Sequence, residues 1–241
     1  MIRWALVRGN PSIVFIRDTE AETSEKIRWF SRHPGEEQGS WVNHVAHLLS
    51  DLWGIVEALF AGVEEGTLEK YDKSETTWGL IVELVGFTRE QHLVADGAAL
   101  LLVGSPYHYV GILKQAIDGF FSKLARRDIY AARRFHLPGL SATICSQLVV
   151  KVHKAAKWII MGLKTIYRKV GKGWHIRIRP KQVLGELPAG RATPDDIWDD
   201  VFEHRPWLYR VVAEINPHLC PEDLIPVIRA KIDRDMGIHR A

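Results

Sequence analysis

Apolar residues recur at helical spacing in two long stretches of the chain. Over residues 42–63 they fall at intervals of three and four, which predicts one long amphipathic helix. A second series runs over residues 148–170, and Gly171 suits the position just after a helix C-terminus. Further helical segments are expected over residues 78–85 and 89–94 with a break near Gly86, and over residues 113–124, 194–215 with a kink at Pro206, and 221–236.

Short apolar runs between these helices predict strands. Residues 98–103 form such a run and stop at Gly104-Ser105-Pro106, which is typical of a buried central strand that ends in a loop. Other strands are expected over residues 26–30, 67–72, 140–145 and 174–179. Strands that alternate with helices favour an open parallel α/β sheet.

Two apolar segments at the start of the chain, residues 2–7 and 12–16, flank Gly9-Asn10-Pro11. They read as a hairpin, or as a strand with an extended return, and we interpret them as an added edge element. The alternative is that residues 4–7 are themselves the first core strand.

The stretch over residues 95–118 resembles the flavodoxin-like NAD(P)H-dependent FMN reductases and quinone reductases. It has the family's Ala-Asp pair, apolar strand, Gly-Ser-Pro turn and aromatic residues, followed by Leu-Lys and Ile-Asp in a helix. The resemblance implies a doubly wound parallel sheet of five strands in the order 2-1-3-4-5. Residues 1–24 would then be an edge extension, residues 25–215 the flavodoxin-like domain, and residues 216–241 a helical extension.

The same resemblance implies an oxidoreductase in which bound FMN takes hydride from NAD(P)H and passes electrons to a quinone, flavin or other small acceptor. His108 and Tyr109 are the catalytic residues that it suggests, because the family's loop lies against the flavin ring. The phosphate is expected at a loop with two serine hydroxyls, two glycines and Arg32, just before a predicted helix. The expected cofactor contacts are Ser31, Arg32, Ser40, Asn43, Ser105, Pro106, Tyr107, His108, Tyr109 and Ser146.

Three departures from the family leave a second class of function open. The phosphate loop carries Glu36 and Glu37, the aromatic loop is shortened, and the loop after Cys145 has no glycine. A binding or regulatory module that keeps this scaffold without flavin would explain them, because a fold does not dictate a function.

The distribution of charge suggests a third class. The formal net charge is +3, but residues 123–181 hold fifteen basic side chains and the single acid Asp128. Such a block attracts polyanions such as nucleic acid, although no recognition motif accompanies it. The alternative is that these basic residues form the solvated side of a helix.

Composition sets the remaining expectations. A chain of 241 residues suits one sizeable domain, and no apolar run reaches the roughly 18 residues of a membrane span. With no signal-peptide pattern, a cytoplasmic protein is expected, and the resemblance adds a homo-oligomer. Cys145 and Cys220 have no CxxC partner and are expected as small buried residues. His44 and His47 lack a third ligand with suitable spacing, so no metal site is predicted.

Overall fold

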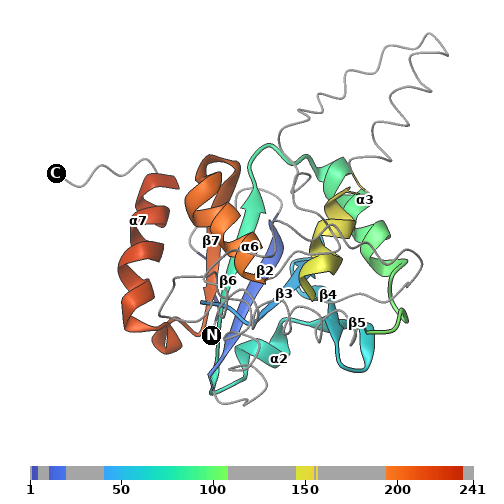
Figure 1. Ribbon diagram of the computed structural model, residues 1–241, viewed down its shortest axis with the longest axis horizontal. Coiled ribbons are helices and arrows are strands. Elements are labelled where there is room, and N and C mark those ends of the chain that lie inside the picture. Colours follow the sequence, from blue (N-terminus) through green and yellow to red (C-terminus); the bar gives the residue numbers. More distant parts are fainter. Residues whose placement is uncertain are drawn as a thin grey trace, which may run out of the picture.

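One antiparallel sheet of seven strands organises the described part of the chain, in the order β1-β7-β6-β2-β3-β4-β5 (Figure 1). The computed structural model describes residues 2–4, 11–19, 41–107, 145–154, 156 and 194–235. All neighbouring strands in the sheet pair antiparallel. The strands are β1 (Ile2–Trp4), β2 (Pro11–Asp18), β3 (His44–Leu48), β4 (Gly54–Leu59), β5 (Gly62–Thr67), β6 (Thr77–Leu84) and β7 (Tyr209–Ile215).

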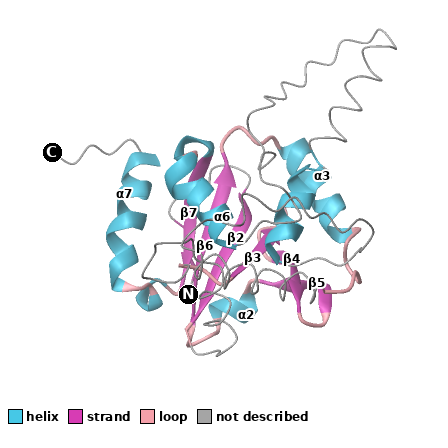
Figure 2. Ribbon diagram, in the orientation of Figure 1, coloured by secondary structure: helices cyan, strands magenta, loops and turns pink. Residues whose placement is uncertain are grey.

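Helices pack around this sheet, as Figure 2 shows. A helix over residues 145–154, called here the Cys145 helix, lies beside α3, and α7 lies alongside β7 (Figure 1). Thr88 caps α3 through a reciprocal pair of hydrogen bonds with Gln91. The helices are α2 (Glu69–Asp72), α3 (Arg89–Leu100), α6 (Pro194–Asp199) and α7 (Ile225–Asp235), with shorter turns η2 (Asp200–His204), η3 (Pro206–Leu208), η4 (Pro217–Leu219) and η5 (Glu222–Leu224).

Both faces of the sheet are buried. On β2, Ile13 and Phe15 point into a large core shared with α3, α6, α7 and the Cys145 helix. Val14 and Ile16 point into a second, smaller core on the opposite face. Every residue of β6 is buried. Strands buried on both faces lose the alternation of apolar and polar residues and read as continuous apolar runs.

The turn from β3 to β4 depends on one aspartate. Asp51 Oδ1 accepts hydrogen bonds from the backbone N–H of Trp53 at 2.9 Å and of Gly54 at 2.7 Å. Leu52 sits in the left-handed region, with a φ of 67°. The turn brings β3 and β4 side by side and so fixes the residues that they carry.

The predicted flavodoxin-like parallel sheet is wrong, because the described strands all pair antiparallel. Residues 98–103 are not a central strand, since α3 continues through Leu100 and a turn follows. The helix predicted over residues 42–63 is instead β3, β4 and the beginning of β5. The apolar residues that suggested a helix belong instead to two buried strands and the turn between them.

Other elements also differ from expectation. The strand predicted over residues 67–72 is the end of β5 followed by α2, and the helix predicted over 78–85 is β6. The helix predicted over 194–215 is α6, η2, η3 and then β7. Residues 12–16, expected at an edge, belong to β2 in the middle of the sheet, and β1 pairs with β7 rather than forming a hairpin with β2.

Several predictions are confirmed. Residues 89–94 are helical in α3, residues 148–154 are helical, and α7 lies within the helix predicted over 221–236. The strands predicted over 26–30 and 174–179, the helix over 113–124 and most of the strand over 140–145 lie outside the described residues. Among the described helices, none has the length and apolarity needed to cross a membrane.

Candidate active site

A histidine and a glutamate meet on one face of the sheet. His44 begins β3, and Glu57 lies on the neighbouring strand β4. The pairs His47–Val56 and Leu48–Ile55 put Glu57 diagonally across from His44, within reach of its side chain. His44 Nε2 lies 2.9 Å from Glu57 Oε2. The Glu57 side chain is fully buried, whereas that of His44 is 15% exposed.

A cysteine completes this group. Cys145 is the first described residue of the Cys145 helix, and its thiol lies close enough to His44 for each group to shift the pKa of the other. Because Nε2 of His44 faces Glu57, Nδ1 is the ring nitrogen available to the thiol. The sulfur also has backbone hydrogen bonds with Val45 and Ser146. Cys145 is 7% exposed, so the thiol is shielded but borders the surface.

The electrostatics favour an ion pair between Cys145 and His44. Burial alone would lower the pKa of His44, but the hydrogen bonds with Cys145 and Glu57 outweigh it and raise the pKa to about 9. Burial would raise the pKa of the Cys145 thiol, but the hydrogen bond with His44 and its charge lower it overall. The arrangement therefore stabilises a thiolate beside an imidazolium.

Glu57 stays ionised. Burial would raise its pKa, yet His44, Lys70 and Tyr71 together lower it to about 2. Tyr71 donates its hydroxyl to Oε2 at 2.5 Å, and Lys70 forms an ion pair with Oε1. Both come from α2, so this short helix holds the carboxylate from the side opposite His44.

Cys145, His44 and Glu57 are thus a nucleophile, a base and a residue that orients the base. A thiolate paired with an imidazolium is the reactive form of cysteine in enzymes that attack acyl groups. A carboxylate on the far ring nitrogen fixes the imidazole and stabilises its charge. These are the parts that nucleophilic catalysis by cysteine requires.

A second polar cluster lies in the large core. His47 Nε2 is 2.9 Å from Asp96 Oδ1, and Asp96 Oδ2 accepts from the backbone N–H of Ser50 at 3.0 Å. His92 Nε2 lies 3.0 Å from the carbonyl oxygen of Leu48. One potential ligand atom from each of His47, His92 and Asp96 lies within 4.8 Å of the others, so these described residues could hold a metal ion. Their hydrogen bonds explain the geometry without one, and we interpret them as a buried polar network.

His153 of the Cys145 helix adjoins this network. Its ring lies 5.5 Å from that of His47, and its Nδ1 is 2.8 Å from the carbonyl oxygen of Val149. Burial and the neighbouring His47 lower the pKa of His153 to about 3. Burial likewise lowers the pKa of His47. The histidines are therefore neutral near pH 7 and anchor the helix that presents Cys145.

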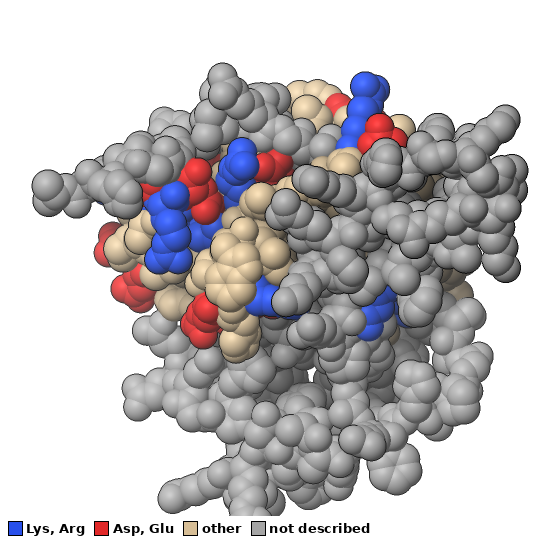
Figure 3. Space-filling view, turned by 90° about the horizontal axis from the view of Figure 1, so that it is seen from above, with Lys and Arg blue, Asp and Glu red and all other residues tan. Residues whose placement is uncertain are grey.

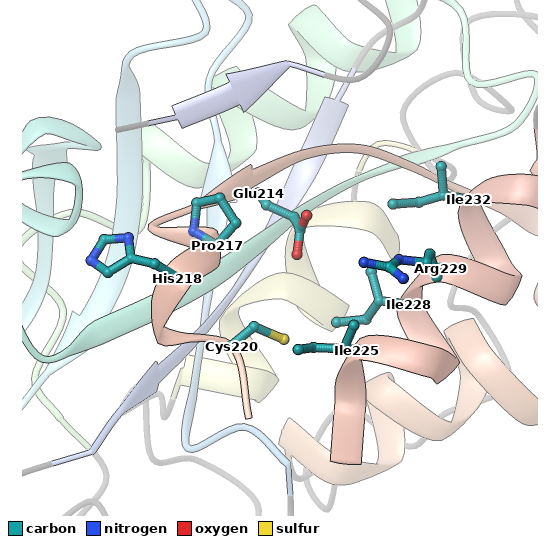
Figure 4. Close-up of a pocket in the computed structure, with 8 residues that line it drawn as sticks. All are labelled: Glu214, Pro217, His218, Cys220, Ile225, Ile228, Arg229 and Ile232. Atoms are coloured by element: carbon teal, nitrogen blue, oxygen red, sulfur yellow. The ribbon is translucent and has the colours of Figure 1, made fainter. Parts of the chain in front are cut away.

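A pocket of about 440 Å³ lies elsewhere, between the end of β7 and α7 (Figure 4). Three isoleucines of α7 line it together with Glu214 and Arg229, whose charged groups both reach toward the opening. Neither Cys145 nor His44 lines this pocket, so it is separate from the candidate active site.

Five of the residues predicted to bind cofactor lie within the described part of the chain. Asn43 exchanges hydrogen bonds with the backbone of Asp18 and ties β3 to β2. The carbonyl of Ser105 accepts from the N–H of Val63, and Pro106 and Tyr107 follow it after the turn that ends at Gly104. Ser146 is buried beside Cys145. Ser31, Arg32, Ser40, His108 and Tyr109 lie outside the described residues.

The structure thus groups the predicted residues differently from the sequence. Asn43 and Ser146 are the chain neighbours of His44 and Cys145, so two predicted contacts adjoin the candidate active site. Sequence reasoning treated Cys145 as an inert buried residue and missed its partners. The signal that could have found it is a cysteine directly before an amphipathic helix, with histidines and carboxylates elsewhere in the chain.

Little of the basic block is described. Of its lysines and arginines only Lys151 and Lys154 fall within the described residues. On the face seen in Figure 3, the basic and acidic side chains of described residues are intermixed. The charge pattern of residues 123–181 therefore stays a feature of the sequence.

Comparisons with known proteins add no relative: no protein-family model matches the chain, and no curated protein matches it.

Proposed function

We propose that this protein is a thiol-dependent acyl-transfer enzyme, which cleaves an amide, ester or thioester through an acyl-cysteine intermediate. One observation carries the proposal. The Cys145 thiol lies beside the His44 imidazole, whose Nε2 is 2.9 Å from the Glu57 carboxylate. Nucleophile, base and orienting group are recognised by such geometry rather than by their order in a sequence.

The reaction follows from the roles of the three residues. The Cys145 thiolate attacks the acyl carbon and forms a C–S bond, and the carbonyl electrons move onto oxygen. As the tetrahedral intermediate collapses, the imidazolium of His44 gives its proton to the leaving group, whose bond to carbon breaks. His44 then takes a proton from water, which attacks the thioester carbon. The C–S bond breaks, so the acid is released and the Cys145 thiolate and His44 imidazolium are restored. Glu57 keeps its charge throughout and orients His44.

The FMN-dependent oxidoreductase activity expected from the sequence stays a prediction, as do its use of NAD(P)H, its small electron acceptor and its assembly as a homo-oligomer. The resemblance behind this prediction is weakened, because residues 98–100 were expected in the central strand and belong instead to α3. Binding of nucleic acid by residues 123–181 also stays a prediction.

The proposal is tested with p-nitrophenyl acetate, a small activated ester. We expect release of p-nitrophenol over many turnovers and an acetyl group on Cys145, detected by mass spectrometry of the digested protein. His44→Gln should slow acetylation at pH 6.5 at least about tenfold, because a thiol with an ordinary pKa near 8.5 is only about 1% ionised there.

The chain supplies its own control. Cys220 is the only other cysteine, and burial raises its pKa to about 12. We expect Cys220→Ser to react like the unmodified protein and Cys145→Ser to carry no thioester. Acetylation of Cys145 at the same rate with and without His44 would contradict the proposal, since it would show an ordinary thiol.

A further inference from the structure

We propose that Tyr71 and Lys70 of α2 are positioning residues for the reaction, which act on Cys145 through Glu57 and His44. The inference rests on the proposed function, since it assigns roles to residues that support the same three groups. Tyr71 and Lys70 each hold one oxygen of the carboxylate on which His44 depends.

Tyr71 and Lys70 each contact a different oxygen of the Glu57 carboxylate. Oε2 of Glu57 lies 2.9 Å from His44 and 2.5 Å from the Tyr71 hydroxyl, so one oxygen accepts from both. Oε1 is held by the ammonium of Lys70. With both oxygens occupied, the carboxylate has one orientation in which its bond to His44 is kept.

The chemistry of the two residues suits this role. Burial and the charge of Glu57 raise the pKa of Tyr71, so its hydroxyl stays protonated and donates at every working pH. Lys70 brings a positive charge next to a buried negative one, while its own side chain is 38% exposed. That exposure allows Lys70 to be changed without opening the core.

The position of α2 is itself fixed from the far side of the sheet. The Asn216 side chain donates to the carbonyl oxygens of Tyr71 at 2.9 Å, Ser74 at 3.0 Å and Thr77 at 3.0 Å. A chain of contacts therefore runs from the end of β7 through α2 to Glu57, His44 and Cys145.

The experiment measures the ionisation of Cys145 directly. Full-length protein is alkylated with iodoacetamide between pH 4.5 and 9.5, and the rate at Cys145 is followed by peptide mass spectrometry. We expect Tyr71→Phe and Lys70→Gln to raise the apparent pKa of the thiol. Their alkylation at pH 6 should fall about three- to tenfold, because a weaker hold on Glu57 lets His44 lose its proton more easily. Lys70→Arg, which keeps the charge, should retain the original profile.

Matched variants separate this role from a structural one. Tyr209 donates its hydroxyl to the buried carboxylate of Asp200, so Tyr209→Phe removes a similar bond away from the candidate site. Lys73 pairs with Glu69 on the surface of α2, so Lys73→Gln is the control for Lys70. We expect neither control to shift the profile, even where the melting temperature falls.

The outcomes distinguish the two proposals. If the unmodified protein shows a thiol of ordinary pKa, the proposed function fails and this inference with it. If the thiol is ionised at low pH in the unmodified protein but also in Tyr71→Phe and Lys70→Gln, the inference alone is overturned. Thermal melts of each variant confirm that the comparison concerns folded protein.

Discussion

The ion pair between His44 and Glu57 makes a quantitative prediction. The pKa of Glu57 is about 2 in the folded protein against 4.5 for the free side chain, which corresponds to about 3 kcal/mol of stability. The pKa of His44 is about 9 against 6.5, which gives a similar figure. The two figures share the interaction between His44 and Glu57, while Cys145 also raises the pKa of His44 and Lys70 and Tyr71 also lower that of Glu57, so the figures are not added. Both side chains are largely buried, so solvent screens the pair little.

A double-mutant cycle isolates this interaction. His44→Gln, Glu57→Gln and the double variant are unfolded in urea with a reducing agent, and the fluorescence of the nine tryptophans reports unfolding. We expect a coupling of about 2 to 3 kcal/mol between pH 4.5 and 6.5, where both partners are charged in the folded state.

The dependence of this coupling on pH follows from the direction of each pKa shift. Glu57 has a lowered pKa, so its contribution is complete above pH 4.5 and is lost as pH falls toward 2. About 2 kcal/mol of it should be gone by pH 3. His44 has a raised pKa, so its contribution is complete below pH 6.5 and is lost as pH rises through 9. A coupling that stays constant from pH 3 to pH 10, or one below about 0.5 kcal/mol at pH 6, would refute the reasoning.

Two further predictions concern the surroundings of the site. His153 and His47 have lowered pKa values in the folded protein. Below pH 6.5 the unfolded chain therefore binds more protons than the folded protein, and the free energy of unfolding decreases as the pH is lowered. His153→Leu should reduce this slope between pH 6.5 and 5 by up to about 1.4 kcal/mol per pH unit in urea titrations, and an unchanged slope would show that His153 is charged in the folded protein. Asn216→Ala removes a buried amide whose two hydrogens serve three carbonyl oxygens, and it leaves alanine at a φ of 48°. It should lower the free energy of unfolding by about 2 to 4 kcal/mol, whereas a loss below about 0.5 kcal/mol would mean that α2 keeps its place without this side chain.

The sequence predicted the presence of some helices better than the strands between them. The helix expected over residues 89–94 lies within α3, which Thr88 and Gln91 cap, but α3 continues to Leu100. The stretch from Val42 to Val63 was mistaken for a helix because β3 and β4 are buried on both faces. Their apolar residues then match a spacing of three or four as well as a spacing of two. The run Asp51-Leu52-Trp53-Gly54 is the turn signal that separates the two strands.

The candidate site could not be assembled from the sequence for a related reason. His44, Glu57 and Cys145 come from two strands and a helix, and Glu57 meets His44 only because of the register of β3 with β4. Once residues 42–63 were taken as one helix, Glu57 had no reason to meet His44. Cys145 was placed at the end of a strand, whereas in the structure it is part of a helix.

The order of strands also has a consequence for how the chain reaches its native state. β2 has as neighbours β3 and the much later β6, and β1 finds its partner only in β7, with Ile2 opposite Ile215. Few of these pairings are local, and loop closure over such lengths slows folding. A ribosome-bound nascent chain would hold β1 unpaired until β7 had emerged. Because Asn216 at the end of β7 also holds α2, which supports Glu57, the proposed site should be completed only after residue 216 has been synthesised.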